Sequence, residues 1–256
     1  MKFSVNILLL VLSINSFGQD YKKIELDLLK SLKKINAFEL SSEQGTNLAP
    51  WDSLKKENEV LKMKLLMYTS KYPATLEYEF TELKKENFYI TTSEDKKFRI
   101  YSWDTFEGGS SHYFENIYQF QSDKVYSVNF DQKRSPEDFG GYYSDIVTLD
   151  TNNRKVYLAY FNAIYSERDG FQAIQPFEIT KNGLNDKLPL VKTKTGLTDK
   201  LGFDYDITSS QNTKKLIYLE NKGKLIKLPQ ISNEGKVTNK YVSYLYTGEY
   251  FEKQKN

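Results

Sequence analysis

The sequence predicts an α+β protein, in which two N-terminal helices precede a predominantly antiparallel β-sheet domain built of hairpins. Before Pro73, apolar residues recur at spacings of three and four, which is typical of amphipathic helices. Beyond Pro73, apolar residues alternate with polar ones, and short polar turns separate the runs. The chain has 256 residues, enough for a domain with a substantial buried core.

The helical segment is expected to cover residues 19–72. The apolar stripe of its first helix consists of Tyr21, Ile24, Leu28, Leu32 and Ile35. After a loop at 41–50, a second helix is expected from about Pro50 to Tyr68, capped by Asp52 or Ser53. Its buried face is expected to contain Leu54, Leu61 and Leu65, helped by Val60, Met67 and Tyr68. Pro73 ends this helical segment.

The β-rich domain is expected to cover residues 73–256. Strands are predicted at Leu76–Phe80, Tyr89–Thr92, Phe98–Trp103, His112–Gln121, Val125–Phe130, Ile146–Leu149, Val156–Tyr165, Phe171–Ile179, Leu201–Ile207, Leu216–Leu219, Leu225–Leu228 and Tyr241–Tyr246. Polar turns at 93–96, 122–123 and 150–154 predict three hairpins. Val156–Tyr165 is apolar on both faces apart from Asn162, so it is expected in the middle of a sheet covered by helices on one side and strands on the other.

A β-propeller is the alternative architecture. Similar segments begin at Lys124, Lys155 and Lys215, which are 31 and 60 residues apart. A four-stranded blade usually needs ~40 residues or more, so this period is short. The two Trp-Asp pairs, Trp51–Asp52 and Trp103–Asp104, fall at a helix start and at a strand end and are not equivalent. The single-sheet interpretation is therefore preferred.

Residues 1–18 have the order of a secretory signal peptide. Lys2 supplies a positive start, Val5–Leu12 is a short apolar run, and Ser16 and Gly18 place small residues before a cut at Gln19. The run is too short for a permanent membrane span. We therefore expect an exported protein, periplasmic or extracellular, without a stable membrane anchor.

The amino-acid composition of the chain argues against several classes of function. The chain carries 36 basic and 34 acidic residues, a formal net charge of +2, whereas nucleic-acid binders normally show a basic excess. There is no cysteine and only one histidine, His112, which excludes thiol chemistry and multi-histidine metal sites. No metal and no cofactor are expected.

The most unusual local stretch runs from Phe98 to Phe120. A strand ends in Trp103 and Asp104, a Gly-Gly-Ser-Ser loop follows, and His112 starts the next strand. This segment resembles one in uncharacterised exported proteins of Gram-negative bacteria. The resemblance implies export and no particular activity.

Aromatic residues in this stretch suggest a ligand-binding patch. Tyr101 and Trp103 share a strand face, and Tyr113 follows the loop that carries Asp104 and His112. Exposed rings form flat platforms for sugars or protein partners. Tyr101, Trp103, Asp104, His112 and Tyr113 are therefore the candidate ligand-binding residues. The alternative is that these rings belong to the core.

Catalytic arrangements have weaker support. Asp104 and His112, with Ser110 or Ser111, supply the residue types of a hydrolytic triad, but a loop between two strands is not a nucleophile elbow. We instead expect His112 to lie at the sheet edge, on the same strand face as Phe114.

Other polar clusters also have simpler interpretations. The carboxylate pairs Glu77/Glu79 and Asp204/Asp206 each lie on one strand face and are interpreted as solvated surface. Asp150, Asn152 and Asn153 lack the rest of a calcium loop and are interpreted as a turn.

We therefore expect a non-catalytic exported binding protein whose partner is an extracellular glycan or protein. The alternative is an exported, metal-independent hydrolase acting on glycans or peptides, using carboxylates or His112 with a serine.

Overall fold

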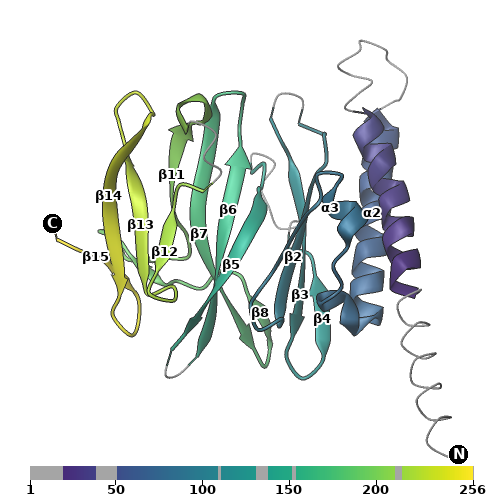
Figure 1. Cartoon of the computed structure of the whole chain (residues 1–256), viewed down its shortest axis with the longest axis horizontal. Helices are drawn as coiled ribbons and strands as arrows, with labels where there is room; N and C mark the ends of the chain where they lie inside the picture. Colours follow the sequence, from purple (N-terminus) through teal and green to yellow (C-terminus); the bar gives the residue numbers. More distant parts are fainter. Residues whose placement is uncertain are drawn as a thin grey trace, which may run out of the picture.

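The protein is a stack of four layers, one of helices and three of β-sheet (Figure 1). The structure is a computed structural model that describes residues 20–38, 51–108, 111–130, 138–151, 154–210 and 215–255. The predicted signal peptide, Ser110, Asn152 and Asn153 lie outside these described residues. Within them, no helix is both long and apolar enough to cross a membrane.

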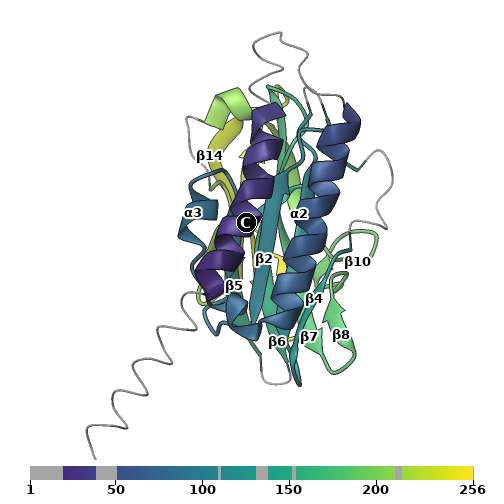
Figure 2. The same ribbon diagram turned by 90° about the vertical axis from the view of Figure 1, so that its right-hand side faces the viewer.

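The helical layer contains a helix at residues 20–38 and α2 (Trp51–Lys71), which lie side by side over β2 in Figure 2. Both predicted helices are confirmed. The apolar stripe of the first is buried from Ile24 to Ile35, and Leu54, Leu61 and Leu65 of α2 are buried. Met67 was expected on the buried face but is 51 % exposed. Asn58 and Thr69 occupy the buried face of α2 instead, because they bond across to the sheet or back to the helix.

Residues 73–84 are not the predicted strand Leu76–Phe80. They form a 3₁₀ turn, η1 (Pro73–Leu76), and a short helix, α3 (Thr81–Lys84). Their backbone groups bond to side chains rather than to the backbone of a neighbouring strand. Arg99 donates to the carbonyls of Thr75 and Tyr78, and buried Glu25 accepts from the backbone nitrogen of Glu82 at 2.6 Å. These bonds replace a β-ladder, and alternation alone could not reveal them.

The first sheet has the order β1-β2-β3-β4 and is entirely antiparallel. Its strands are β1 (Tyr89–Thr92), β2 (Phe98–Asp104), β3 (Phe114–Gln121) and β4 (Val125–Val128). Two of the predicted hairpins are therefore confirmed. The third strand begins at Phe114, two residues later than expected, so His112 lies in the preceding loop. One face of this sheet packs on the helices and the other on the second sheet.

The second sheet has the order β11-β7-β6-β5, with β8 paired to β7. Its strands are β5 (Tyr142–Asp150), β6 (Lys155–Ile164), β7 (Asp169–Thr180), β8 (Gly183–Asn185) and β11 (Leu201–Asp206). The β6 strand is central and buried on both faces, as predicted. The elements that cover its two faces differ from the prediction. Tyr157 and Phe161 pack against the first sheet, and Leu158 and Tyr160 pack against the third sheet. The helices do not cover this sheet, because the first sheet lies between them (Figure 1).

The third sheet has the order β10-β9-β15-β14-β13-β12. Its strands are β9 (Val191–Lys192), β10 (Leu197–Thr198), β12 (Tyr218–Glu220), β13 (Leu225–Ile231), β14 (Val237–Tyr246) and β15 (Phe251–Lys253). The β15–β9 pair is parallel, at Phe251 and Val191. The sequence did not predict β8, β9, β10 or β15. Each has only two or three residues, too few to show a period.

The predicted α+β class, with N-terminal helices followed by antiparallel sheets built of hairpins, is confirmed. The three sheets stack face to face, with one apolar core between each pair of neighbouring layers. A propeller would instead place small sheets radially around a channel. The similar segments that begin at Lys124, Lys155 and Lys215 therefore do not mark repeated blades.

Candidate binding pocket

Tyr101 and Trp103 share a strand face as predicted, but that face is buried beneath the helices. Both side chains are 0 % exposed. The Trp103 ring stacks on Phe88 with ring centroids 5.9 Å apart, and Phe80 contacts the Tyr101 ring edge-on. The predicted exposed platform is therefore wrong for these two residues. The alternative interpretation, core packing, is correct for them.

Asp104 and His112 do come together. A carboxylate oxygen of Asp104 contacts Nδ1 of His112, and the His112 side chain is 40 % exposed. The other Asp104 oxygen accepts from the backbone nitrogen of Phe106 at 2.9 Å, which fixes the carboxylate. The His112 ring also stacks on Phe114, with ring centroids 6.4 Å apart, although His112 lies in the loop and not on the predicted strand face. The pair therefore has the geometry of an imidazole oriented by a carboxylate.

The loop that carries His112 is attached to the end of β6. The hydroxyl of Ser111 donates to the carbonyl of Tyr165 at 2.9 Å, and the backbone nitrogen of His112 donates to the carbonyl of Ile164 at 3.1 Å. Tyr113 packs edge-on against Phe139, with ring centroids 4.7 Å apart. The Ser111 hydroxyl is therefore committed to a backbone carbonyl rather than aligned with His112.

A pocket of about 560 Å³ opens next to this junction. Its main lining residues are Tyr165, Arg168, Asp169, Asp204, Tyr205 and Asp206. Glu234 and Gly235, from the turn between β13 and β14, complete one wall. The pocket thus lies where the second and third sheets meet, at the same end of the strands as the histidine loop.

Strand pairing explains why these distant segments meet. The start of β7 and the end of β11 pair antiparallel, so that Asp169 lies opposite Asp206 and Gly170 opposite Tyr205. The backbone nitrogen of Asp206 then donates to the carbonyl of Gly235 at 2.8 Å. This bond ties the β13–β14 turn to the pocket wall.

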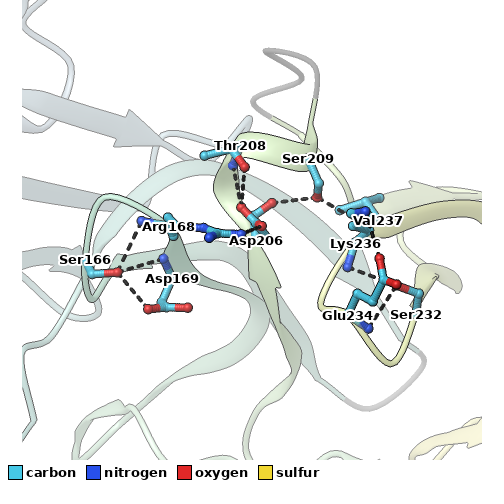
Figure 3. A network of polar contacts seen from close by, with 10 residues as sticks. All are labelled: Ser166, Arg168, Asp169, Asp206, Thr208, Ser209, Ser232, Glu234, Lys236 and Val237. Atoms are coloured by element: carbon cyan, nitrogen blue, oxygen red, sulfur yellow. Dashed lines mark hydrogen bonds and ion pairs between the residues drawn. The ribbon is translucent and has the colours of Figure 1, made fainter.

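Asp206 is the fixed anion of the pocket (Figure 3). One of its oxygens accepts from Nη2 of Arg168 at 2.8 Å, and the other accepts from the hydroxyl and backbone nitrogen of Thr208 at 2.6 and 2.9 Å. These bonds, led by the one from Arg168, lower the pKa of Asp206 to about 2. Asp206 is 8 % exposed, whereas the Arg168 side chain is 72 % exposed. The carboxylate is therefore held ionised, with its partner at the rim.

The turn that positions Arg168 is built around Ser166. The Ser166 hydroxyl donates to the carboxylate of Asp169 at 2.7 Å and accepts from the backbone nitrogens of Arg168 and Asp169 (Figure 3). On the opposite wall, Lys236 and Glu234 form an ion pair of 2.7 Å. Both walls are thus internally bonded.

The pocket has an acidic balance and an aromatic component. Four of its lining residues are carboxylates and one, Arg168, is a cation. Burial raises the pKa of the Tyr165 hydroxyl, and the charges of Asp204 and Asp138 raise it further. Burial also raises the pKa of Tyr205. Both phenols therefore stay neutral and remain hydrogen-bond donors at neutral pH.

Sequence reasoning found parts of this pocket without recognising it. The sequence pattern places Asp204 and Asp206 on one strand face, which was interpreted as solvated surface. Asp204 is exposed, in agreement, but Asp206 is buried beside Arg168. Their meeting depends on the β7–β11 pairing, which the local pattern does not specify.

Glu77 and Glu79 do not lie on a strand, because their segment is η1 and the coil after it. In the part of the chain that the structure describes, no group of three or more His, Asp or Glu side chains is placed to hold a metal ion.

Comparisons with protein-family models, with curated proteins and with solved structures find no match to this chain.

Proposed function

We propose that the protein is an exported, non-catalytic binding protein that takes an extracellular glycan into the pocket at the β6–β7 turn. The observation that carries this proposal is a pocket of about 560 Å³ that combines two tyrosines with fixed polar groups. Small-molecule sites typically have volumes of ~300–1,000 Å³ and a few well-placed polar groups.

The chemistry of the lining favours a hydroxylated ligand. Tyrosine presents a flat apolar ring and a polar tip, which suits the mixed faces of a sugar. Asp206 and Asp169 are held in place by Arg168 and Ser166, so their remaining lone pairs are pre-oriented to accept from hydroxyl groups. The surplus of carboxylates disfavours acidic glycans. Neutral or amino sugars are therefore the expected ligands.

Export enters the proposal through residues 1–18, whose pattern is that of a cleaved leader. Intact leader on protein confined to the cytoplasm would count against it. Mass spectrometry of the N-terminus of protein from each cell fraction makes this check.

The binding proposal is tested by calorimetric titration of the purified protein with neutral, amino and uronic-acid oligosaccharides. We expect saturable binding of a neutral or amino glycan. A ligand present at a hundred times its Kd would also stabilise the fold by ~2.7 kcal/mol, visible as a raised melting temperature.

Two pocket variants, Tyr165→Ala and Asp204→Asn, should each weaken that binding at least five-fold, the equivalent of ~1 kcal/mol. Their matched controls are Tyr241→Ala and Asp52→Asn, which alter exposed residues outside the pocket. Saturable binding that neither pocket variant affects would place the ligand elsewhere and remove the proposal.

A hydrolase is the second candidate, because Asp104 and His112 contact each other as an orienter and a base would. This candidate needs a nucleophile, and the described serine nearest to the pair, Ser111, donates to Tyr165 instead. A fluorophosphonate probe tests the form of this candidate that uses a serine with His112. Labelling that disappears in His112→Ala would favour the hydrolase, and no labelling would count against its serine form.

A further inference from the structure

We propose that a second groove, under the segment 73–84, binds an oxyanion through Arg99. The groove has a volume of about 310 Å³ and lies between that segment and the β1–β2 hairpin. Its charged lining comprises Glu77, Glu79, Lys84, Glu94, Lys96 and Arg99. It shares no lining residue with the pocket at the β6–β7 turn, so this inference is independent of the glycan proposal.

Arg99 is a nearly buried cation with donor capacity left over. The residue is 3 % exposed. Its Nε donates to the hydroxyl of Thr92 at 2.7 Å, and its Nη1 donates to the carbonyls of Thr75 and Tyr78 at 2.7 and 2.5 Å. The guanidinium also lies over the Tyr101 ring, 5.8 Å from its centroid. A guanidinium has five N–H groups, and the bonds to Thr92, Thr75 and Tyr78 use those on Nε and Nη1. Within the described ranges, no carboxylate lies within 4.0 Å of it.

Among the described residues, Arg99 has no carboxylate in direct contact, which is unusual because buried charges are normally paired. The charge of Arg99 reaches Glu79 only at longer range, and the pKa of Glu79 is lowered first by its bond to Lys84. The two backbone carbonyls offset part of the desolvation of Arg99, but they carry no net charge. An anion entering the groove would supply the missing partner and accept from Nη2. A guanidinium suits this role because its planar fork matches the oxygens of carboxylate and phosphate groups.

The other charged side chains of the groove are paired or screened by water, so Arg99 is the main positive charge that an anion in the groove would meet. Lys84 pairs with Glu79 at 3.0 Å, and Lys96 pairs with Glu77 at 3.0 Å. The remaining carboxylate, Glu94, is exposed and therefore screened by water. The two ion pairs at the rim are thus neutral, whereas the base of the groove is positive.

Thr92 supplies a second donor beside Arg99. Its hydroxyl oxygen accepts from Nε, which leaves the hydroxyl proton directed elsewhere. Thr92 also lines the groove. A small oxyanion bound there would accept from both Nη2 of Arg99 and the hydroxyl of Thr92. The shared chemistry is that of carboxylate, sulfate or phosphate groups, either free or carried by a larger molecule.

The first test follows the Nε–H resonance of Arg99 in ¹⁵N-labelled wild-type protein. Sodium phosphate, sulfate and glucuronate are titrated separately at constant ionic strength, with sodium chloride as the reference. We expect a saturable shift with at least one oxyanion, and the salt that saturates at the lowest concentration identifies the source. A response no larger than that to chloride overturns the proposal.

Substitution of Arg99 itself is unsuitable, because its bonds also hold the segment 73–84 in place. The variants therefore alter its surroundings. Thr92→Val should weaken oxyanion binding about five-fold, the loss of one hydrogen bond. Lys84→Gln should weaken binding and Glu79→Gln should strengthen it, each by about two-fold, as exposed charges do.

The matched control is Lys56→Gln, an exposed lysine of α2 far from the groove in the chain, which should leave the affinity unchanged. Saturable binding that responds in the expected direction to all three groove variants supports the site. Saturable binding that ignores Thr92→Val and both charge variants places the anion elsewhere and overturns it.

Discussion

The indole nitrogen of Trp103 donates a hydrogen bond of 3.0 Å to the side-chain oxygen of Asn58, joining the first sheet to α2. The amide nitrogen of Asn58 donates in turn to the carbonyl of Thr105 at 2.9 Å. Both side chains are buried, so this polar link crosses the core between α2 and the first sheet, as does the bond of 2.9 Å from the side chain of Gln119 to the carbonyl of Thr69. It fixes where the helix lies along the sheet.

Replacing Asn58 with alanine should therefore destabilise the protein. The change leaves the Trp103 nitrogen and the Thr105 carbonyl buried without a partner, and each such group costs roughly 1–3 kcal/mol. We expect a loss of about 2–4 kcal/mol in the free energy of unfolding, measured by urea denaturation. Lys56→Ala, on the exposed face of the same helix, should change it by less than about 0.5 kcal/mol. Equal effects would contradict the role of the polar link.

The two faces of the third sheet should respond very differently to truncation. Phe251 is 0 % exposed and packs toward the second sheet, whereas Tyr241 is 37 % exposed on the outer face. Phe251→Ala should cost about 3–5 kcal/mol, as for other buried phenylalanines. Tyr241→Ala should cost less than about 1 kcal/mol. Similar losses in thermal or urea unfolding would mean that both faces are covered.

Gln172 is a buried polar residue that joins the second and third sheets. It is 2 % exposed, and its side-chain oxygen accepts from the backbone nitrogens of Leu216 and Ile217 at 2.8 and 3.1 Å. Gln172→Leu keeps the volume but leaves both N–H groups buried, so we expect a loss of about 2–4 kcal/mol. Gln121→Leu, at an exposed strand end, serves as the control in the same denaturation series.

Asp206 should make stability depend on pH in the acid range. Its pKa is lowered to about 2 by Arg168 and Thr208, below the ~3.9 of an unfolded aspartate. A lowered pKa stabilises the fold above the unfolded value, and that contribution is lost as the pH falls toward 2. Asp206→Asn should therefore lower the urea midpoint at pH 7, and the difference from wild type should shrink at pH 2.5. A difference that is constant with pH would contradict this.

The local periodicity of the sequence predicted most of the fold. The helices around Leu28 and Leu61 follow from the 3.6-residue period, and β1 and β6 follow from alternation or continuous burial. The segment 76–80 alternates equally well, yet it is not a strand. The carbonyl of Tyr78 accepts from Arg99, 21 positions further along the chain, and no local rule can anticipate such a partner.

The site was less predictable than the fold for the same reason. Alternation showed that Tyr101 and Trp103 share a face, but it could not show that helices cover that face. The pocket combines Tyr165, Asp206 and Glu234, which meet only through strand pairing and a turn from another sheet. The sequence identified the Asp104–His112 loop as unusual, and the structure places it against the pocket wall.

The layers of the stack are also synthesised largely in order, because most of each layer is formed by a later part of the chain. The helices, the first sheet and the central hairpins of the second sheet all come from residues before 181. One side of β6, with Leu158 and Tyr160, is covered by residues from Leu188 onward. A chain that is still being synthesised therefore exposes this apolar face of β6 until its final strands have formed. During that interval, a chaperone or a second incompletely folded chain would bind most readily to this exposed apolar surface.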